Sequence, residues 1–402
     1  MASLNPFKPG AGHMPPHLAG RNAETDAFKH LLKQETILSN VVLTGLRGVG
    51  KTVLLETWKP LAMSQKWLWV GTDLSESTSL SEETLVIRLL TDLSVVTSGL
   101  MVSKQASFPA GFAPGGAPEF ERLSYEKLLD IYRSTPGLPS DKLKAILHAV
   151  WECLKCHGYK GIIFAYDEAQ TMTDHAEKEQ YPLSLMLDVF QSIQKQGIPF
   201  MLVMVGLPTL FPKLVETRTF AERMFEVITL GRLQDAHSRE AITKPITAAK
   251  CPISFSEESV GLVVKTSGGY PFFIQFICKE VFDIFLQKFN VGEPVPSVPM
   301  KEIVRKLDKD FFAGRWAKAT DRQRQLLSII STLENCDEEF TVQQIVAEAK
   351  SMANPFSSSH VNQMLATLTE AGLIYKNRYA RYSFAVPLMG QFILRTDREA
   401  NL

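Results

Sequence analysis

A glycine-rich stretch near the N-terminus carries the most specific chemistry in this sequence. Residues 41–52 read Val-Val-Leu-Thr-Gly-Leu-Arg-Gly-Val-Gly-Lys-Thr, an apolar run that leads directly into G-x-x-x-x-G-K-T. A strand, a glycine loop and then a helix is the order that a phosphate-binding loop needs. The inward N–H groups of such a loop and the helix N-terminus bind phosphates. The alternative is a glycine-rich turn that happens to end in Lys-Thr.

The residues of this loop have distinct expected roles. Lys51 is expected to reach the β- and γ-phosphates, and the Thr52 hydroxyl is expected to bind Mg²⁺. The full set of expected nucleotide contacts in the loop is Gly45, Gly48, Val49, Gly50, Lys51, Thr52 and Val53.

A second stretch ends in two adjacent carboxylates. Residues 161–168 read Gly-Ile-Ile-Phe-Ala-Tyr-Asp-Glu, an apolar strand followed by Asp167 and Glu168. In a nucleotide site Asp167 would hold Mg²⁺ through water, and Glu168 would orient and polarise the attacking water. The alternative is a solvated strand end. The presence of Glu168 favours hydrolysis over nucleotide binding alone.

Two arginines precede a predicted fifth strand at residues 227–230. An arginine at this place can reach the γ-phosphate held by a neighbouring subunit and stabilise charge in the transition state. We assign this role to Arg223 rather than to Arg218. The alternative is that both are ordinary surface arginines.

Composition limits the class of protein. The chain has 402 residues, more than one ordinary core, and 45 % of them are hydrophobic. Lys plus Arg and Asp plus Glu both number 43, so no global basic field indicates nucleic acid or an anionic membrane. Neither a membrane span nor a secretory signal is visible, and the cytoplasm is the expected compartment.

Five cysteines, an odd number, argue against a disulfide framework. Cys153 and Cys156 form a single C-x-x-C, for which half of a zinc site and a redox pair are the functional interpretations. The other cysteines are expected to be small buried hydrophobes.

Further elements are expected along the chain. Residues 1–20 are predicted to form an arm that either lies along the adenine or acts as a tether. Ser79 and Glu82 have the spacing of a capping box for a helix that extends to about residue 96. Residues 97–118 form a loop so long that it must be functional or mobile. Residues 232–290 are predicted to be helical, with a turn at residues 266–271, and residues 291–299 form a proline-rich linker.

Three helices and a hairpin, within residues 321–384, describe a C-terminal winged helix. If it binds duplex DNA, residues 357–363 would enter the major groove, and Lys376, Arg378 and Arg381 would contact phosphates. Residues 301–402 hold 14 basic and 12 acidic side chains, a net charge of only +2. A protein partner, or a lid over the nucleotide, is therefore the alternative role.

The motifs together resemble the AAA+ ATPases, and most of all the branch of origin-recognition initiators and signal-transducing ATPases. The chain is also similar to bacterial "ATP-binding proteins" that open with N-P-F-x-P-G and A-G-R-x-x-E, here residues 5–10 and 19–24. The resemblance implies an α/β fold with a five-stranded parallel P-loop core, a helical lid and a winged helix. It also implies ATP and Mg²⁺ as ligands and an active site completed between subunits of a homo-oligomer that assembles with ATP.

The resemblance also predicts domain boundaries and two departures. We expect an arm at 1–29, the ATPase core at 30–231, the lid and linker at 232–299, and the winged helix at 300–402. The fourth strand is followed by Gly206-Leu207-Pro208 in place of a polar first sensor. The second-sensor arginine is replaced by Gly269-Tyr270-Pro271, which looks like the G-x-P of the signal-transducing branch, where Tyr270 and Pro271 would pack by the nucleotide.

Two functions follow from these expectations. The first is an ATPase with slow expected turnover that acts as a molecular switch, whose nucleotide state controls its assembly and its engagement of DNA or a protein partner. The second is a DNA-binding regulator in which ATP is mainly structural. A P-loop kinase or GTPase fits less well, because the guanine motif N-K-x-D is missing from the sequence.

Overall fold

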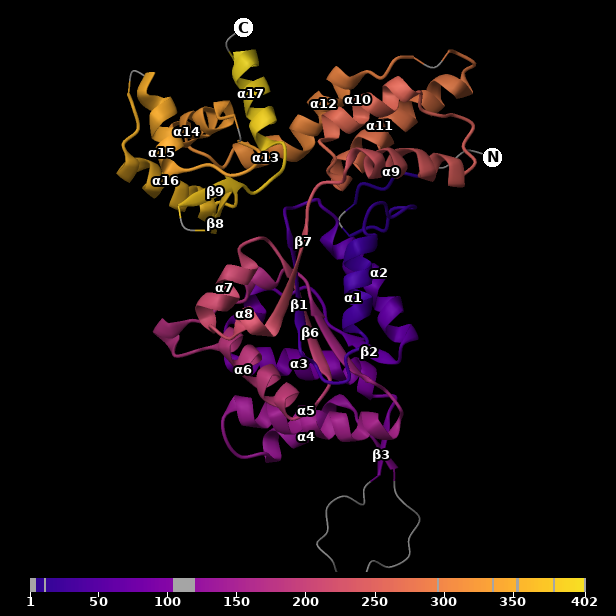
Figure 1. The fold of residues 1–402 in the computed structure, drawn as a ribbon, viewed down its shortest axis with the longest axis vertical. Helices are drawn as coiled ribbons and strands as arrows, with labels where there is room; N and C mark the ends of the chain where they lie inside the picture. Colours follow the sequence, from indigo (N-terminus) through magenta and orange to yellow (C-terminus); the bar gives the residue numbers. More distant parts are fainter. Residues whose placement is uncertain are drawn as a thin grey trace, which may run out of the picture. The chain divides into compact units, whose positions relative to one another are not determined.

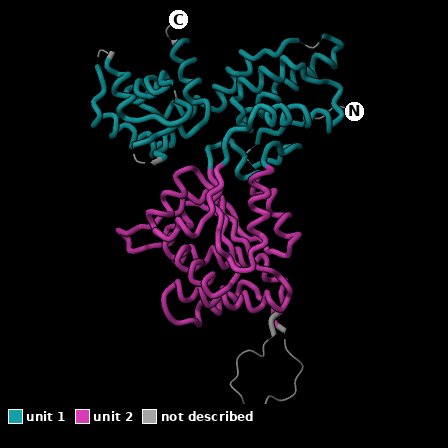
Figure 2. Tube along the Cα trace, viewed as in Figure 1, with its two compact units in different colours: residues 1–21, 45–53, 230–402 teal, residues 22–44, 54–229 magenta. Residues whose placement is uncertain are grey.

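The structure is a computed structural model that describes residues 5–10, 12–103, 120–294, 296–334, 336–351, 354–378 and 380–400. The chain forms two compact units, which Figure 2 distinguishes by colour. Unit 1 comprises residues 1–21, 45–53 and 230–402, and unit 2 comprises residues 22–44 and 54–229. Unit 1 is therefore built from segments that are far apart in the sequence.

A five-stranded parallel sheet forms the centre of unit 2 (Figure 1). Its strand order is β2-β5-β6-β1-β7. The strands are β1 (Asn40–Gly45), β2 (Trp67–Val70), β5 (Gly161–Tyr166), β6 (Phe200–Gly206) and β7 (Phe225–Leu230). Parallel pairing aligns Thr44 of β1 with Gly206, and Tyr166 of β5 with Met204. The strands β1, β5 and β6 therefore end at one edge of the sheet, and the predicted α/β core is confirmed.

Apolar strands and amphipathic helices explain this core. Every residue of β5 and β6 is buried, as expected for parallel strands that are covered on both faces. The helices of this part of the chain are α1 (Asn22–Leu31), α2 (Lys51–Ser64), α3 (Glu82–Thr97), α4 (Tyr125–Ser134), α5 (Pro139–Cys156), α6 (Pro182–Lys195), α7 (Leu210–Thr217) and α8 (Ala221–Met224). Phe28 of α1 stacks on Trp58 of α2 with 4.4 Å between ring centroids.

Two local predictions need correction. The capping box of α3 pairs Ser81 with Thr84, whereas Ser79 belongs to a short 3-10 helix, η1 (Glu76–Ser79). Both pairs have the same spacing, so the spacing alone could not distinguish them. The predicted loop at 97–118 is entered and left through an antiparallel pair, β3 (Met101–Ser103) and β4 (Phe120–Arg122). Residues 104–119 of that loop lie outside the described part of the chain.

The helical region of unit 1 that was predicted as a lid contains α9 (Asp235–Ala248), α10 (Glu257–Ser267) and α11 (Pro271–Asn290). Their apolar faces form one cluster, in which Ile242, Val263 and Ile277 are fully buried. Among the described residues, no helix is both long and apolar enough to cross a bilayer.

The C-terminal region contains the predicted three helices and hairpin. They are α14 (Asp321–Thr332), α15 (Val342–Glu348), α16 (Ser358–Glu370), β8 (Ile374–Arg378) and β9 (Arg381–Phe384), and the two strands pair antiparallel. Two additions were not predicted. A helical segment precedes α14 and consists of α12 (Met300–Leu307), the π-helical turn η4 (Asp308–Phe312) and α13 (Ala313–Trp316). A last helix, α17 (Met389–Ala400), follows the hairpin and contacts α14.

A buried amide pair joins three strands in unit 2. Asn40, at the start of β1, is 1 % exposed, and its side chain accepts from the Leu202 N–H of β6 at 2.7 Å. It also donates to the Met224 carbonyl at 3.2 Å, just before β7. Gln194 of α6 donates to Asn40 Oδ1 at 2.8 Å and to the Phe200 carbonyl at 2.7 Å. The network thus connects β1, β6 and the residue that precedes β7.

Asn40→Ala is expected to lower the free energy of unfolding of unit 2 by about 2–4 kcal/mol, because it leaves buried backbone and amide groups without partners. Four of the five tryptophans lie in unit 2, so denaturant unfolding followed by tryptophan fluorescence reports on it. The exposed Asn290→Ala is the control and should change that energy by less than about 0.5 kcal/mol. Equal effects of the two substitutions would contradict the prediction.

Candidate functional site

The glycine loop at residues 45–52 has a backbone that only glycine adopts readily. Gly45, Gly48 and Gly50 have φ values of 155°, 81° and 91°. These are positive φ values, which L residues with a side chain rarely adopt. A Cβ atom on Gly45 would also lie 2.5 Å from the Leu230 carbonyl oxygen. The glycines are therefore needed for the curled shape of a phosphate-binding loop.

The residues that follow the loop begin a helix. Lys51 is the first residue of α2, and its Nζ donates to the carbonyls of Gly45 and Leu46 at 2.9 and 3.0 Å. Its ammonium group therefore lies across the loop. Thr52 and Val53 are partly buried in the first turn of α2, and Val49 is 1 % exposed. The loop, the lysine and the N-terminus of a 14-residue helix together form a cradle suited to phosphate oxygens.

Two distant segments bind the outward carbonyls of the loop. Arg21 is 6 % exposed, and its Nη2 donates to the Val49 carbonyl at 3.0 Å and to the Gly231 carbonyl at 2.8 Å. The backbone N–H of Phe272, in the first turn of α11, donates to the Gly48 carbonyl at 3.1 Å. The loop is thus held from the N-terminal arm and from the predicted lid.

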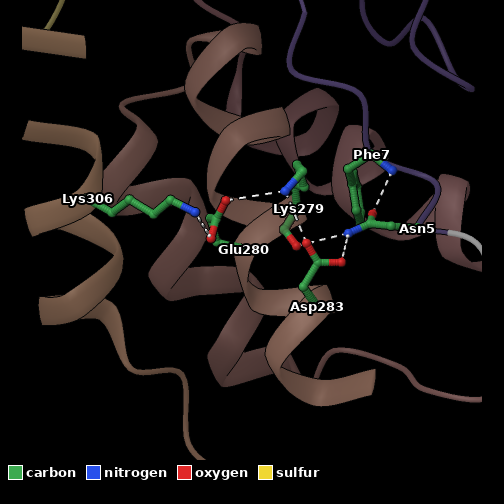
Figure 3. A network of polar contacts seen from close by, with 6 residues as sticks. All are labelled: Asn5, Phe7, Lys279, Glu280, Asp283 and Lys306. Carbon is green, nitrogen blue, oxygen red and sulfur yellow. Dashed lines mark hydrogen bonds and ion pairs between the residues drawn. The ribbon is translucent and has the colours of Figure 1, made fainter. Parts of the chain in front are cut away.

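The N-terminal arm docks on α11 (Figure 3). The Asn5 amide donates to Asp283 Oδ1 at 2.7 Å and to the Lys279 carbonyl at 2.9 Å. Phe7 is 3 % exposed and belongs to the apolar cluster of α9, α10 and α11. Lys279 pairs with Asp283 at 3.1 Å. These contacts favour the tether over the adenine-contacting interpretation of residues 5–10.

The turn between α10 and α11 contacts both the segment that follows β7 and the C-terminal core. Gly268 and Gly269 have φ values of 59° and 77°, and the Gly269 carbonyl accepts from the Leu233 N–H at 2.8 Å. Tyr270 precedes α11, Pro271 is its first residue, and the Tyr270 ring packs against the C-terminal core. Burial raises the pKa of Tyr270. The residue of this turn that bonds to the phosphate loop is therefore Phe272, through its backbone.

The two carboxylates of unit 2 differ sharply in exposure. Asp167 follows β5, is 5 % exposed, and accepts from the Glu168 N–H at Oδ1 with a distance of 2.7 Å. Its backbone forms a parallel bridge to Asp73, beyond β2. Glu168 is exposed and has a φ of 52°. This left-handed backbone turns the Glu168 side chain away from the strand direction.

Gln170 connects Glu168 to the loop that follows β6. Its amide nitrogen donates to Glu168 Oε2, and its Oε1 accepts from the Leu207 N–H at 3.1 Å. A Cβ atom on Gly206 would lie 2.5 Å from that Oε1, so the glycine leaves room for the amide. The Gln170 carbonyl accepts from Lys213 at 2.9 Å. Gln170 is therefore the polar group that links Glu168 to the place where a first sensor was expected.

The donor atoms fit a nucleotide with Mg²⁺. Magnesium prefers oxygen ligands and keeps several waters, with one or two protein oxygens and phosphate oxygens completing its shell. Thr52, in the first turn of α2, offers a hydroxyl oxygen, and Asp167, directly after β5, offers a carboxylate. These are the residues that would hold the ion. When bound, it would neutralise charge on the phosphates.

The two arginines before β7 lie in different environments. Arg218 forms a two-point ion pair with Asp188, with distances of 2.9 and 2.8 Å. That hydrogen bonding raises the pKa of Arg218. Arg223, in the single turn α8, has an exposed side chain for which the described residues offer no hydrogen bond or ion pair. Of these two arginines, Arg218 is thus engaged by Asp188, whereas the exposed guanidinium of Arg223 has no such pair among the described residues.

The C-x-x-C pair lies at the end of α5. Cys153 is buried, which raises the pKa of its thiol, and Cys156 is exposed. All five cysteines are free thiols, and the described residues contain no group of three or more His, Cys, Asp and Glu side chains that could hold a metal ion. A raised thiol pKa also opposes a reactive redox cysteine.

Sequence reasoning missed several residues that the structure places at these sites. Arg21 appeared only as a letter of the A-G-R segment, although an arginine beside a glycine before the loop was a usable signal. Gln170 follows the two carboxylates directly and could have been suspected. Phe272 acts through its backbone N–H, which no residue type reveals.

Comparisons with known proteins agree with this architecture. The model of a domain of unknown function, DUF8462, matches residues 309–393. No match was found among curated proteins. A solved structure of a Walker-type ATPase from Pyrococcus abyssi is similar, with 15 % identity, a TM-score of 0.57, and coverage of 94 % of this chain and 96 % of that chain. The ORC2 protein of Aeropyrum pernix in its ADP form is 14 % identical, with a TM-score of 0.54 and coverage of 98 % and 99 %.

The strand order, the glycine loop before α2, and these similarities in shape define the class of fold. The chain has the fold of an origin-recognition-type AAA+ P-loop ATPase. At such low identities the similarity concerns the fold alone.

Replacing Arg21 by Met should loosen the phosphate loop, because the buried Val49 carbonyl and the Gly231 carbonyl lose a charged donor while the volume of the side chain is largely kept. We expect faster hydrogen exchange at residues 45–53 and a loss of about 2–4 kcal/mol of stability in unit 1. Exchange measured by mass spectrometry tests this. The exposed Arg133→Met on α4 is the control, and unchanged exchange at residues 45–53 in the Arg21 variant would refute the role.

Proposed function

We propose that this chain binds and hydrolyses ATP with Mg²⁺ and acts as a molecular switch. The observation that carries the proposal is the loop of three positive-φ glycines, across which the Lys51 ammonium lies, directly before α2. This arrangement is suited to the phosphates of a nucleotide. Further support comes from a solved structure of the Aeropyrum pernix ORC2 protein described as ADPNP–ADP complexes, which is 12 % identical with a TM-score of 0.53.

The proposed roles follow from position and chemistry. Gly45, Gly48, Val49, Gly50 and Val53 line the phosphates through their backbone. Lys51 neutralises the β- and γ-phosphates, and Thr52 and Asp167 hold Mg²⁺. Tyr270 and Pro271 lie beside the nucleotide in this proposal. The Tyr270 ring also packs on the C-terminal core.

Glu168 is the proposed general base. An exposed carboxylate can accept a hydrogen bond from the attacking water and polarise it toward the γ-phosphate. The amide of Gln170 holds one of its oxygens, which leaves the other for water. The left-handed backbone at Glu168 fixes the direction in which this carboxylate points.

The output of the switch is assigned to the C-terminal winged helix, residues 300–402. The start of α16 exposes Ser358, Ser359 and His360, which could enter a DNA major groove. The Asn377 amide of the hairpin donates to Glu339 at 3.0 Å, so a carboxylate lies beside the basic residues of the wing. We therefore propose that the partner is either duplex DNA or a protein. Assembly with ATP would change the affinity for that partner.

A DNA-binding regulator with structural ATP is the second candidate. The exposed polar start of α16 favours it, and it needs no hydrolysis. The two candidates differ in how DNA and the state of the nucleotide affect each other.

Glu168→Gln is expected to lower ATP turnover by about 10²–10⁴-fold, because it removes the general base while the phosphate loop is intact. ATP affinity should stay within about threefold of the wild-type value, since Glu168 does not hold the phosphates. Steady-state release of phosphate and nucleotide titration measure both quantities. Lys51→Ala is the control that should lose binding as well.

The same Gln variant separates the two candidates when duplex DNA is added and the mass is measured by light scattering. A switch predicts that ATP traps the variant in an assembled state. A regulator predicts unchanged mass and unchanged DNA binding. Undiminished turnover in the variant would remove Glu168 from the proposal.

Arg223→Ala should reduce turnover by about 10²-fold or more if its guanidinium reaches the γ-phosphate of a neighbouring subunit, given the known size of such arginine effects. The loss should appear only at concentrations at which the protein assembles. Arg218→Ala is the matched control, because it breaks the pair with Asp188 and should affect stability rather than turnover. Equal turnover in both variants would contradict the role of Arg223.

A further inference from the structure

Four exposed lysines of unit 2 lie where the chain enters the strands of the parallel sheet. Lys66 and Lys160 directly precede β2 and β5, Lys195 ends α6 shortly before β6, and Lys33 lies between α1 and β1. The strands β2, β5 and β6 are neighbours in the sheet (Figure 1). We call these four residues the lysine cluster. It lies at the amino edge of the sheet, whereas the two carboxylates follow the carboxyl end of β5.

Hydrogen bonds hold three of these loops together. The Lys160 N–H donates to the Lys66 carbonyl at 2.9 Å. The indole N–H of Trp67, the residue after Lys66, donates to the Leu32 carbonyl at 3.2 Å. Lys33 follows Leu32 directly, so its backbone is held beside the start of β2. The positions of these three lysines are therefore set by the fold.

The loop before β6 joins the same group through a close backbone approach. The Ile162 N–H donates to the Pro199 carbonyl at 3.3 Å. A Cβ atom on Gly161 would lie 2.0 Å from that carbonyl oxygen, so the glycine permits the approach. Lys195 is four residues before Pro199, and it therefore belongs with the other lysines.

The charge of the cluster is not neutralised locally. The loops of residues 32–39, 64–66, 157–160 and 195–199 contain four lysines and one acidic residue, Glu35, so four minus one gives a net charge of +3. Among the described residues, no lysine of the cluster forms an ion pair, and Lys195 donates only to the Gln191 amide oxygen at 3.3 Å. The whole chain is neutral, with 43 basic and 43 acidic residues, so this positive field is local.

Lys66 keeps its side chain at a cost in backbone conformation. Its φ is 65°, in the left-handed region, and it follows the end of α2. Glycine, or sometimes asparagine, usually occupies such a position, because glycine adopts a positive φ without steric penalty. The presence of a lysine there agrees with a use for its ammonium group.

The phosphates of duplex DNA fit the size and chemistry of the cluster. Two spacings of about 4.8 Å separate β2 from β6, so the cluster is about 10 Å wide and matches about three phosphates of one strand. Single strands are held by stacking on aromatic rings, but the rings at these strand starts, Trp67 and Phe200, are buried. Membrane surfaces need a continuous apolar face, whereas the exposed Leu38 and Met63 belong to separate segments.

We propose that the lysine cluster binds the phosphate backbone of duplex DNA without reading its sequence. Lysines contact phosphates as point charges, and phosphate contacts carry no direct sequence information. This surface belongs to unit 2 and is separate from the C-terminal winged helix. It needs no nucleotide, so the inference does not rest on the proposed ATPase activity.

The test measures the affinity of the full-length chain for a short mixed-sequence duplex by fluorescence anisotropy, without nucleotide, over a series of salt concentrations. Replacing all four lysines of the cluster by Gln should reduce the slope of log K against log salt by about 3 and weaken binding at low salt by about tenfold or more. Lys160→Gln alone should reduce the slope by about 1. A duplex of different sequence should give the same losses.

The matched control removes the same charge elsewhere in unit 2. It replaces four lysines of α4, α5 and η3 (Ala176–Lys178) by Gln, namely Lys127, Lys142, Lys144 and Lys178. This variant should change the slope by less than about 1. Equal losses in the two variants would overturn the inference, since net charge alone would then explain them.

The remaining outcomes also decide the matter. An unchanged slope in the cluster variant overturns the inference, because any duplex binding would then belong to another surface such as the winged helix. Loss of binding to phosphatidylserine vesicles with unchanged duplex binding overturns it in favour of a membrane. If the fourfold variant fails to fold, Lys160→Gln and Lys195→Gln decide by their separate slopes. Loss of ATP turnover in Glu168→Gln bears on the proposed function and leaves this inference unaffected.

Discussion

The phosphate loop can bind phosphates only if its outward carbonyls have partners. When successive N–H groups of a loop point inward, the carbonyls of the same peptide units point outward, and buried carbonyls without donors are costly. Here Arg21 serves the Val49 carbonyl, and the Phe272 N–H serves the Gly48 carbonyl. The loop thus depends on residues 28 positions before and more than 200 positions after it.

This requirement explains the make-up of unit 1. It contains the N-terminal arm, the phosphate loop and everything after residue 229, although residues 40–44 of β1 before the loop and residues 54–64 of α2 after it belong to unit 2. Asn5 and Phe7 fasten the arm to α11, and Arg21 then reaches both the loop and Gly231, where the chain leaves the sheet. A change in the conformation of the loop therefore alters the contacts of the arm and of the start of the predicted lid.

The two carboxylates that follow β5 lie in different environments. Asp167 is buried at the end of a strand, and Glu168 is exposed through a left-handed backbone, so neighbouring residues with the same functional group acquire different environments. Gln170 fixes one oxygen of Glu168 and the backbone of Leu207 at the same time. The Gln170 side chain thus links Glu168 to the loop that follows β6.

The sequence alone determined the elements whose sequence patterns lie within a few consecutive residues. Two parts of the core were predictable: the strand, glycine loop and helix at residues 40–64, and the strand that leads to Asp167. Their apolar pattern, glycines and charged residues each lie within a few consecutive positions. The three C-terminal helices and the hairpin followed from the same kind of pattern. Local spacing could not identify the capping box of α3, because the pairs that begin at Ser79 and at Ser81 have the same spacing. Only the packed structure distinguishes the two pairs.

Tertiary structure alone decided which distant groups meet. The contacts of Arg21 with Val49 and of Phe272 with Gly48 depend on where the chain returns after long separations, and both involve backbone atoms. The pairing of Arg218 likewise depends on Asp188, 30 residues away. The sequence specifies the groups that can do chemistry, whereas folding specifies their partners, because side-chain type is local and proximity is not.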